Sequence, residues 1–192
     1  MNERASAIRS AMTERTTVHD YATTPVDIDV VNRALTAALQ APNHRMTEPW
    51  RFAVVGRETR EPLVAISIEL KGQKSGGKVD PSTANSVRDK MMNPAWLIVV
   101  SQLCNANPSV AREDYAAVAC AVQNLMLSLH ADGIGSKWST GAVVTDPRSY
   151  QHLGIDPAHE QIVGFVWVGL PAKSPVKVPR KLTLQAVTRY LP

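Results

Sequence analysis

Apolar residues recur at helical spacing in the first forty residues of the chain. The first such stripe has polar residues on its opposite side and predicts an amphipathic helix with the apolar positions Ala5, Ile8 and Met12. After a loop from Thr16 to Pro25, Asp27 is a suitable N-cap for a second helix, because its carboxylate can accept from backbone N–H groups of the first turn. Pro42 is expected to follow its end. The apolar stripe of this second helix consists of Ile28, Val31, Leu35, Ala38 and Leu39.

Three apolar runs have the length and composition of strands. Phe52–Val55 is short, rich in β-formers and closed by Gly56. Ala95–Val100 and Ile162–Val168 are continuously apolar, which is typical of strands buried on both faces. Between the first two runs, a further helix is expected to stop at Gly72; its apolar positions are Leu63, Ile66 and Leu70.

The segment from Ala111 to Ala131 is apolar nearly all round, so it is expected to form the central, buried helix of the protein, with Gly133 as its C-cap. Beyond it, Trp138 to Gly141 is expected to form a polar turn. Asp146 and Pro147 then begin a short helix.

Two segments have too little apolar content to form a core of their own. Residues 71 to 90 are almost entirely polar, which favours a mobile surface lid or a poorly ordered loop. The proline-rich tail from Pro171 is expected to lie as an arm across another surface, such as that of a second copy of the chain.

The composition is that of an ordinary globular protein. With 192 residues, 44% hydrophobic and 20% charged, the chain is expected to form a single domain, 1–192. The N-terminus lacks the apolar stretch of a signal peptide, and no window has the length of a membrane span, so we expect a cytoplasmic protein without a membrane partner. Cys104 and Cys120 have neither disulfide nor zinc-site spacing and are expected to be buried, reduced thiols. The histidines likewise lack metal-ligand spacing, so no metal is expected.

The net charge of +4 is concentrated in the tail, whose last twenty-one residues contain no acid. Its basic residues are Lys173, Lys177, Arg180, Lys181 and Arg189. This excess indicates an anionic ligand or partner. A nucleic acid is disfavoured, because aromatic residues are not interleaved with the basic ones. The sequence also has no glycine-rich phosphate loop of the GxGxxG or GxxxxGKS type, which argues against a Rossmann or P-loop site.

Five segments, in order and spacing, resemble the nitroreductase-like flavoproteins. They are RTTVHDY (15–21), APNHRMTEPW (41–50), KWSTGAVVTDP (137–147), IVGFVWVGLP (162–171) and VPRKLTLQAV (178–187). The resemblance covers nearly the whole chain. It implies an α+β fold with a central, mostly antiparallel sheet flanked by helices, and a C-terminal arm (171–192) exchanged across a homodimer that binds FMN at the subunit interface.

The resemblance assigns the phosphate and ribityl chain of FMN to Arg15, Thr16 and Thr17. A guanidinium with short hydroxyl donors suits a phosphate monoester. Relatives often have a second basic residue where Thr16 stands, and Arg180 of the tail is expected to supply that charge. On local grounds alone, this segment would be an ordinary helix end followed by a polar turn, and Arg180 a solvated arm residue.

The resemblance also implies that His44 and Glu48 reach the flavin from the opposite subunit. Relatives usually have an amide where Glu48 stands, and a carboxylate can only accept, for example from the flavin N3 proton. The turn of Trp138, Ser139 and Thr140 is expected to contact the flavin ring and phosphate end. His19 occupies the place of a basic residue near flavin N1, where a histidine would make charge stabilisation depend on pH.

The implied activity is that of an FMN-dependent oxidoreductase. Flavin N5 takes hydride from NAD(P)H, and a small-molecule electron acceptor such as a nitroaromatic or quinone then takes it in a ping-pong cycle, with no catalytic acid, base or nucleophile from a side chain. Alternatives are another reaction on the same scaffold, such as enone reduction or dehalogenation, and a flavin-binding or regulatory module without efficient turnover. The residues 71–90 are expected to set substrate choice.

Overall fold

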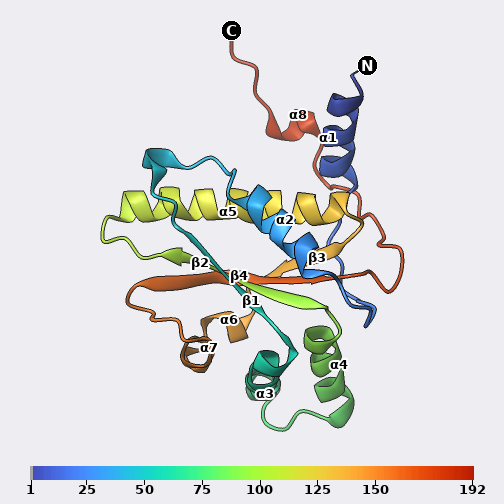
Figure 1. Ribbon diagram of the computed structural model, residues 1–192, viewed down its shortest axis with the longest axis vertical. Coiled ribbons are helices and arrows are strands. Elements are labelled where there is room, and N and C mark those ends of the chain that lie inside the picture. Colours follow the sequence, from blue (N-terminus) through green and yellow to red (C-terminus); the bar gives the residue numbers. More distant parts are fainter. Residues whose placement is uncertain (1) are drawn as a thin grey trace.

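The computed structural model describes residues 2–192, which build one four-stranded antiparallel sheet with helices on both faces (Figure 1). The strand order is β1 (Trp50–Val55), β2 (Trp96–Leu103), β4 (Glu160–Gly169) and β3 (Gly135–Ser139). The two apolar runs of the sequence form the central strands β2 and β4, which are buried on both faces, as predicted. The predicted α+β class with an antiparallel sheet is therefore confirmed.

On one face of the sheet, α2 (Ile28–Ala38) and α5 (Pro108–Ala131) pack against β2 and β4 through a continuous apolar core. The side chain of Asp27 accepts from Asp29 N and caps α2, as predicted. A first helix, α1 (Glu3–Glu14), forms where the apolar spacing predicted it, but contributes no buried residue and projects from the body beside α5 (Figure 1).

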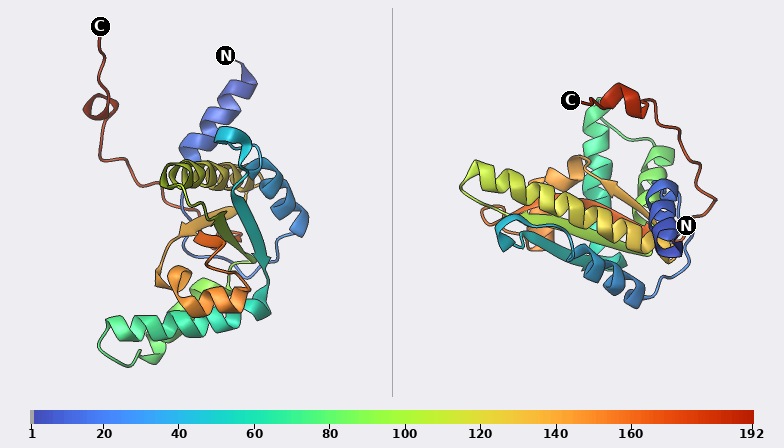
Figure 2. Two further views of the ribbon diagram at one scale, coloured as in Figure 1. Left: turned by 90° about the vertical axis from the view of Figure 1, so that its left-hand side faces the viewer. Right: turned by 90° about the horizontal axis from the view of Figure 1, so that it is seen from above.

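The opposite face is covered by α3 (Arg57–Lys74), α4 (Pro81–Met92), α6 (Ala142–Thr145) and α7 (Pro147–Leu153). These helices enclose a second apolar cluster, in which Phe165 and Trp167 of β4 meet edge to face with ring centroids 6.1 Å apart. The sheet is thus the middle layer of three (Figure 2).

Residues 17 to 22 run along the outer edge of β3 and the end of β4. Val18 N donates to Ser136 O at 3.1 Å, and Ala22 N donates to Leu170 O at 2.9 Å. Because this segment leads directly out of α1, the basic residue at the end of that helix is held beside the sheet. The arm begins at the same place, where Ala172 N donates to Asp20 O at 3.0 Å.

The arm then leaves the body. Its short helix α8 (Leu184–Val187) overlaps α1 in Figure 1, but Figure 2 shows the arm standing apart from the remainder of the molecule. Every side chain from Ala172 to Val187 is exposed. These include the apolar residues Val176, Val178, Leu182, Leu184 and Val187.

The prediction of a polar lid or loop at 71–90 is wrong. α3 continues two residues past Gly72, and residues 81–92 form α4. The helix begins because Asp80 accepts from Thr83 N at 3.0 Å and Pro81 occupies the first turn. It is attached to α3 by a bidentate ion pair between Arg88 and Glu61. Met91 and Met92 at its end are buried, and this short apolar contact is enough to hold α4 against the sheet.

The predicted burial of the two cysteines is also wrong, since both Cys104 and Cys120 are exposed. Cys120 lies on a face of α5 that nothing else among residues 2–192 covers. Its neighbours there include Tyr115, Ala116 and Gln123, all exposed. The central helix is therefore buried on one side only, although its sequence is apolar nearly all round.

The predicted polar turn at 138–141 is partly wrong, because Trp138 and Ser139 are the last residues of β3. The strand is short and contains polar residues, which suits its position at the sheet edge under residues 17–22. The helix predicted at Asp146 and Pro147 is present as α7, with Asp146 as its N-cap.

No helix among residues 2–192 is long and apolar enough to cross a membrane. Within the same residues, no group of three or more His, Cys, Asp or Glu side chains is arranged to hold a metal ion.

Candidate functional site

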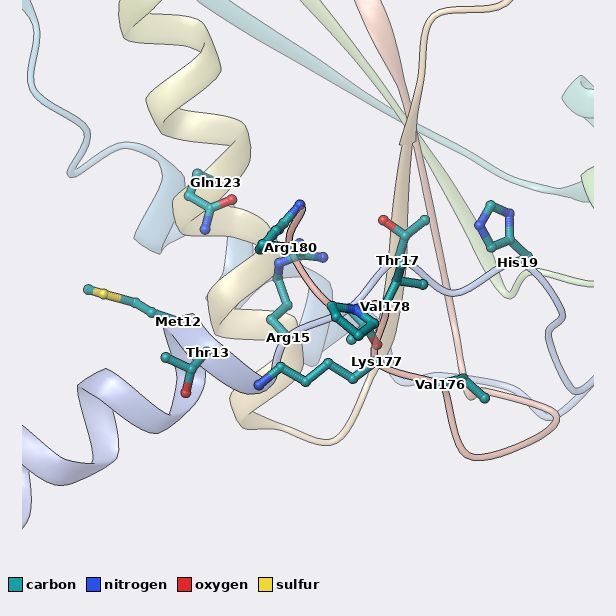
Figure 3. A pocket seen from close by; sticks show the side chains of 12 residues that line it. Met12, Thr13, Arg15, Thr17, His19, Gln123, Val176, Lys177, Val178 and Arg180 are labelled. Carbon is teal, nitrogen blue, oxygen red and sulfur yellow. The ribbon is translucent and has the colours of Figure 1, made fainter. Parts of the chain in front are cut away.

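A cavity of about 720 Å³ opens between the end of α1, the segment that follows it, α5 and the arm. Arg15, Thr16 and Thr17 form one wall, and residues 176–180 of the arm form the other (Figure 3). Gln123 reaches it from α5. The structure thus brings together four residues that the sequence nominated from opposite ends of the chain, namely Arg15, Thr16, Thr17 and Arg180.

The cavity is lined by cations and contains no acid. Arg15, Lys177 and Arg180 all border it, and none of the three has an ion pair among the described residues. In Figure 3 the side chains of Arg15 and Arg180 are both seen at the cavity. Like charges held together without a counter-charge repel, so an anion that entered the cavity would be bound favourably.

Thr16 adds a hydroxyl without a partner. Its Oγ1 is buried and makes no hydrogen bond within the described residues. Such a group ordinarily costs about 1–3 kcal/mol relative to a paired one. A bound acceptor oxygen would remove that cost, so this wall fits a phosphate group better than an apolar ligand.

His19 lies where this cavity meets two others. One is a small cavity of about 250 Å³ under the start of the arm. The second, of about 500 Å³, extends between residues 19–21 and the polar face of α4. The α4 side chains that line it are Ser82, Asn85, Ser86, Asp89 and Lys90. An elongated ligand with an anionic end could therefore pass His19 and meet hydroxyl, amide and ammonium groups, together with the carboxylates of Asp20 and Asp89.

Lys137 of β3 lies near Lys90. The pKa of Lys137 is lowered, mainly because burial disfavours its charged form and also because the charge of Lys90 is close. Neither lysine has an ion pair among the described residues. Two neighbouring cations, one half-buried, form a second place where negative charge would be stabilised.

Of the nominated residues at the end of β3, Trp138 and Ser139 make contacts within the fold. Ser139 Oγ accepts from Trp167 Nε1 at 3.0 Å and donates to Phe165 O at 3.4 Å. The Trp138 indole lies directly over Gly164, where a Cβ would overlap its Nε1, and that Nε1 is buried with no hydrogen-bond partner in the part of the chain that the structure describes. Thr140 is exposed. None of these three lines the cavity.

His44 and Glu48 are also outside the cavity of their own chain. They lie in a loop around the short 3-10 helix η1 (His44–Met46), at the N-terminal end of α5. His44 Nδ1 is 3.0 Å from Glu113 Oε2, and Glu48 N donates to Asn43 Oδ1 at 2.7 Å. Both side chains are exposed, so they are free to meet another molecule.

Sequence reasoning missed Gln123, Lys177, Lys90 and Lys137 as members of this region. Gln123 had a signal, since it is a polar residue inside an otherwise apolar helix. Lys177 belonged to a basic tail in which only one residue was nominated. Lys90 and Lys137 are 47 positions apart in the numbering, and only the packing of α4 against the sheet brings them together.

A family model described as “Nitroreductase family” matches residues 12–170. The chain is 29% identical over 171 residues to “Putative NAD(P)H nitroreductase YfhC” of Bacillus subtilis (strain 168), a match that covers 88% of this chain and 87% of the relative. It is 30% identical over 149 residues to “Putative NAD(P)H nitroreductase YdjA” of Escherichia coli (strain K12), covering 76% of this chain and 79% of that one.

Solved structures share the fold over almost their whole length. A nitroreductase-like family protein from Bacillus cereus superimposes with a TM-score of 0.82 at 24% identity and covers 95% of both chains. The FMN-dependent nitroreductase NfnB from Mycobacterium smegmatis, in complex with NADPH, gives 0.79 at 16% identity, covering 97% of this chain and 99% of NfnB. A nitroreductase with bound FMN from Bacteroides fragilis NCTC 9343 gives 0.72 at 22%, covering 99% and 100%. At these identities the likeness is one of fold.

Proposed function

Because the chain belongs to the nitroreductase family, we propose that it is an FMN-dependent oxidoreductase that uses NAD(P)H to reduce a nitroaromatic, a quinone or a similar small acceptor. The two relatives bear the name NAD(P)H nitroreductase, and solved neighbours contain FMN or NADPH. When bound, FMN supplies the hydride chemistry, and the ring gains negative charge as it is reduced. The protein must hold the cofactor and favour that charge.

The observation that carries the proposal is the acid-free cationic cavity. Its volume of about 720 Å³ lies within the ordinary range for cofactor sites. Arg15 and Arg180 would hold the FMN phosphate, with Thr16 and Thr17 as hydroxyl donors. The buried, unpartnered Thr16 Oγ1 is the group whose surroundings fit this role best, since nothing within the described residues satisfies it.

The ring would extend past His19 toward α4. Asn85 and Ser86 offer groups that both donate and accept, which suits the polar edge of a flavin. Lys90 and Lys137 would stabilise the negative charge of the reduced ring. No side-chain acid, base or nucleophile is assigned, because FMN, when bound, would supply the hydride chemistry.

The proposal includes a homodimer with exchanged arms, and FMN at the interface. The exposed apolar residues of the arm need a surface to cover them, and the exposed face of α5 at Tyr115 and Cys120 offers one to a second copy. A second copy would also bring its own His44 and Glu48 to the flavin, since these side chains do not line the cavity of their own chain. Trp138, Ser139 and Thr140 would support the ring through the backbone at the end of β3.

The test is the visible spectrum of the purified protein with FMN, before and after anaerobic NADH or NADPH. We expect flavin absorption that either nicotinamide bleaches and that nitroaromatic or quinone restores. Bound FMN that no nicotinamide bleaches would favour a flavin-binding module, and a colourless protein that ignores added FMN would overturn the proposal.

Arg15→Gln tests the phosphate site directly. Losing one charge-assisted interaction of about 2 kcal/mol should weaken FMN binding about thirtyfold. The melting temperature of the FMN-free protein should stay unchanged, because Arg15 has no ion pair to lose. Arg4→Gln, at an exposed position on α1, is the matched control and should bind FMN as the wild type does. Equal FMN affinities of the two variants would contradict the assignment of Arg15.

A further inference from the structure

The loop from Asn43 to Glu48 is held in a conformation that its residues do not favour. Arg45, Met46 and Glu48 have φ angles of 59°, 52° and 45°, in the left-handed region that side chains with a Cβ disfavour. None of the three is a glycine. Strain of this kind persists only where the surroundings impose it, and it is concentrated at functional sites.

A chain of three hydrogen bonds imposes it here. Asn43 Oδ1 accepts from Glu48 N at 2.7 Å, and Asn43 Nδ2 donates to Thr47 Oγ1 at 2.9 Å. The Thr47 hydroxyl then donates to Asp114 Oδ1 at 2.6 Å. The chain runs in one direction, from an amide through a hydroxyl to a carboxylate that can only accept when ionised. It closes the loop on itself and fastens it to α5.

Asp114 is an unusual anchor because its residue is only 4% exposed. A buried carboxylate is costly unless hydrogen bonds compensate for its lost hydration. Among the described residues, the Thr47 hydroxyl is the one side-chain partner of Asp114. An acid is thus kept inside the protein to hold one loop hydroxyl.

What the anchored loop presents is a set of exposed side chains. Met46 is 74% exposed, and His44 and Glu48 are exposed beside it. The strained conformation therefore does not bury these three side chains within this chain. A rigid, exposed and strained loop is suited to meeting another molecule in a fixed geometry.

The molecule that this loop is suited to meet is not a ligand in the cavity of the same chain. Asp114 and Gln123 are nine residues apart on α5, about 13 Å along the helix, and the loop adjoins the first while the cavity adjoins the second. If two copies pack their exposed α5 faces antiparallel about a two-fold axis near Ala119, the end of α5 that holds the loop in one copy lies opposite the end that borders the cavity in the other. Each loop then meets the other copy's cavity.

We infer that Asn43, Thr47 and Asp114 are positioning residues that fix the 43–48 loop for the flavin site of a second copy of the chain. The inference rests on the proposed function and adds to it the residues that preset the partner's side of the site. These three residues act through the loop and do not touch the cofactor.

Thr47→Val is the first test, since valine has the shape of threonine without the hydroxyl. We expect a folded dimer whose FMN dissociation constant rises about tenfold and whose visible circular dichroism and flavin midpoint potential both change. Asp114→Asn keeps an acceptor oxygen for Thr47, so this variant should retain most of the wild-type FMN affinity. Thr59→Val, at an exposed position of α3 on the opposite face of the sheet, is the control and should match the wild type in all three measurements.

Mixed dimers test whether the loop acts on the other copy. A dimer of one Arg15→Gln chain and one Thr47→Val chain, purified through two tags, should contain one fully native flavin site and one doubly damaged site. Its titration should therefore show one tight FMN per dimer, with the wild-type dichroism. If the loop acted within its own chain, both sites would be damaged once and none would be tight.

Two results would overturn the inference. One is a Thr47→Val protein with the affinity, dichroism and potential of the wild type, or with a lower melting temperature alone. The other is a mixed dimer without a tight site. A wild-type chain that fails to bind FMN would be recognised before any variant is made, and would overturn the proposed function together with this inference.

Discussion

On the α3 and α4 face of the sheet, charged side chains pair from one helix to the next, whereas those around the cavity on the α1 side have no protein partner. Arg88 binds Glu61 with both terminal nitrogens, and Arg148 reaches Glu69 at 2.6 Å. Arg15 and Arg180 have no such pair among the described residues. The first face is complete within a single chain.

The difference separates residues that stabilise the chain from residues kept for a ligand or a second copy. Apolar groups follow the same division. Leu63, Leu97 and Phe165 are fully buried on the complete face, while Val178 of the arm and Met12 beside the cavity are exposed. Substitutions of the paired or buried residues on the complete face should lower stability and leave FMN affinity alone, and those around the cavity should do the reverse.

Deleting residues 176–192 should produce the largest effect on binding. The deletion removes Lys177 and Arg180 from the cavity, and two charge-assisted contacts of about 1.5–3 kcal/mol each correspond to at least a hundredfold loss of FMN affinity. It also removes the apolar arm, so light scattering should detect a monomer. The FMN-free melting temperature should fall only as far as loss of the second copy lowers it, because the arm buries almost nothing in its own chain.

A shorter deletion, of residues 188–192, is the control for this truncation. It ends after α8 and leaves the cavity wall intact, so FMN affinity should stay within about threefold of the wild type. Comparable losses from the two deletions would mean that the extreme C-terminus, and not the cavity wall, binds the cofactor.

Arg60→Met should produce the largest effect on stability. Arg60 is fully buried and donates to the carbonyls of Met91 and Pro94 at 3.2 and 2.7 Å, and to two further carbonyls. Burial, followed by the charge of Arg57, lowers the pKa of Arg60 to about 10, so it stays protonated at neutral pH. Leaving these carbonyls without a donor should cost about 3 kcal/mol, or about 10 °C in Tm for a chain of this length.

The folded fraction of Arg60→Met should still bind FMN with wild-type affinity, which fluorescence titration at low temperature can measure. Arg57→Met is the matched control, because Arg57 donates to one carbonyl, that of Met92, and is exposed. Its Tm should fall by less than half as much. A change in FMN affinity as large as the change in stability would remove the distinction between the two faces.

The sequence predicted those elements whose own residues show a recognisable pattern. The runs that became β2 and β4 are apolar without interruption, and α2 has a capping aspartate and a complete apolar stripe. α4 was missed because its stabilisation comes from the cap at Asp80, the pair with Glu61 and two methionines, none of which forms a periodic pattern. β3 was missed because an edge strand tolerates polar residues.

The candidate site was predictable only where a motif marked it. Arg15 and Arg180 were nominated from the family resemblance, and the fold does bring them to one cavity. Lys90 lies in the polar segment whose sequence favours a lid, and Gly164 gave no sign that the Trp138 indole rests on it. Such contacts depend on the register between β3 and β4, which no single segment encodes.

The smallest effect concerns Lys137, whose titration should make both stability and FMN affinity depend on pH. Its pKa is lowered by burial and by Lys90, so in the unfolded chain it binds its proton more tightly than in the fold. The stability of the FMN-free protein should therefore rise as the pH climbs through the lowered pKa, and level off above the ordinary lysine value of about 10.5. FMN affinity should fall over the same window, because the ammonium that would stabilise the cofactor's negative charge is lost.

Opposite pH slopes for stability and for FMN affinity are what a partly buried cation reserved for a ligand produces. Lys137→Gln should flatten both slopes and weaken FMN binding only about threefold at pH 7, since a half-exposed charge is well screened by solvent. Lys71→Gln, at an exposed position on α3, should leave both slopes as they are in the wild type. Thermal melts and FMN titrations between pH 7 and pH 10.5 measure the two quantities. If stability and FMN affinity changed with pH in the same direction, the charge of Lys137 would serve the fold and not the cofactor.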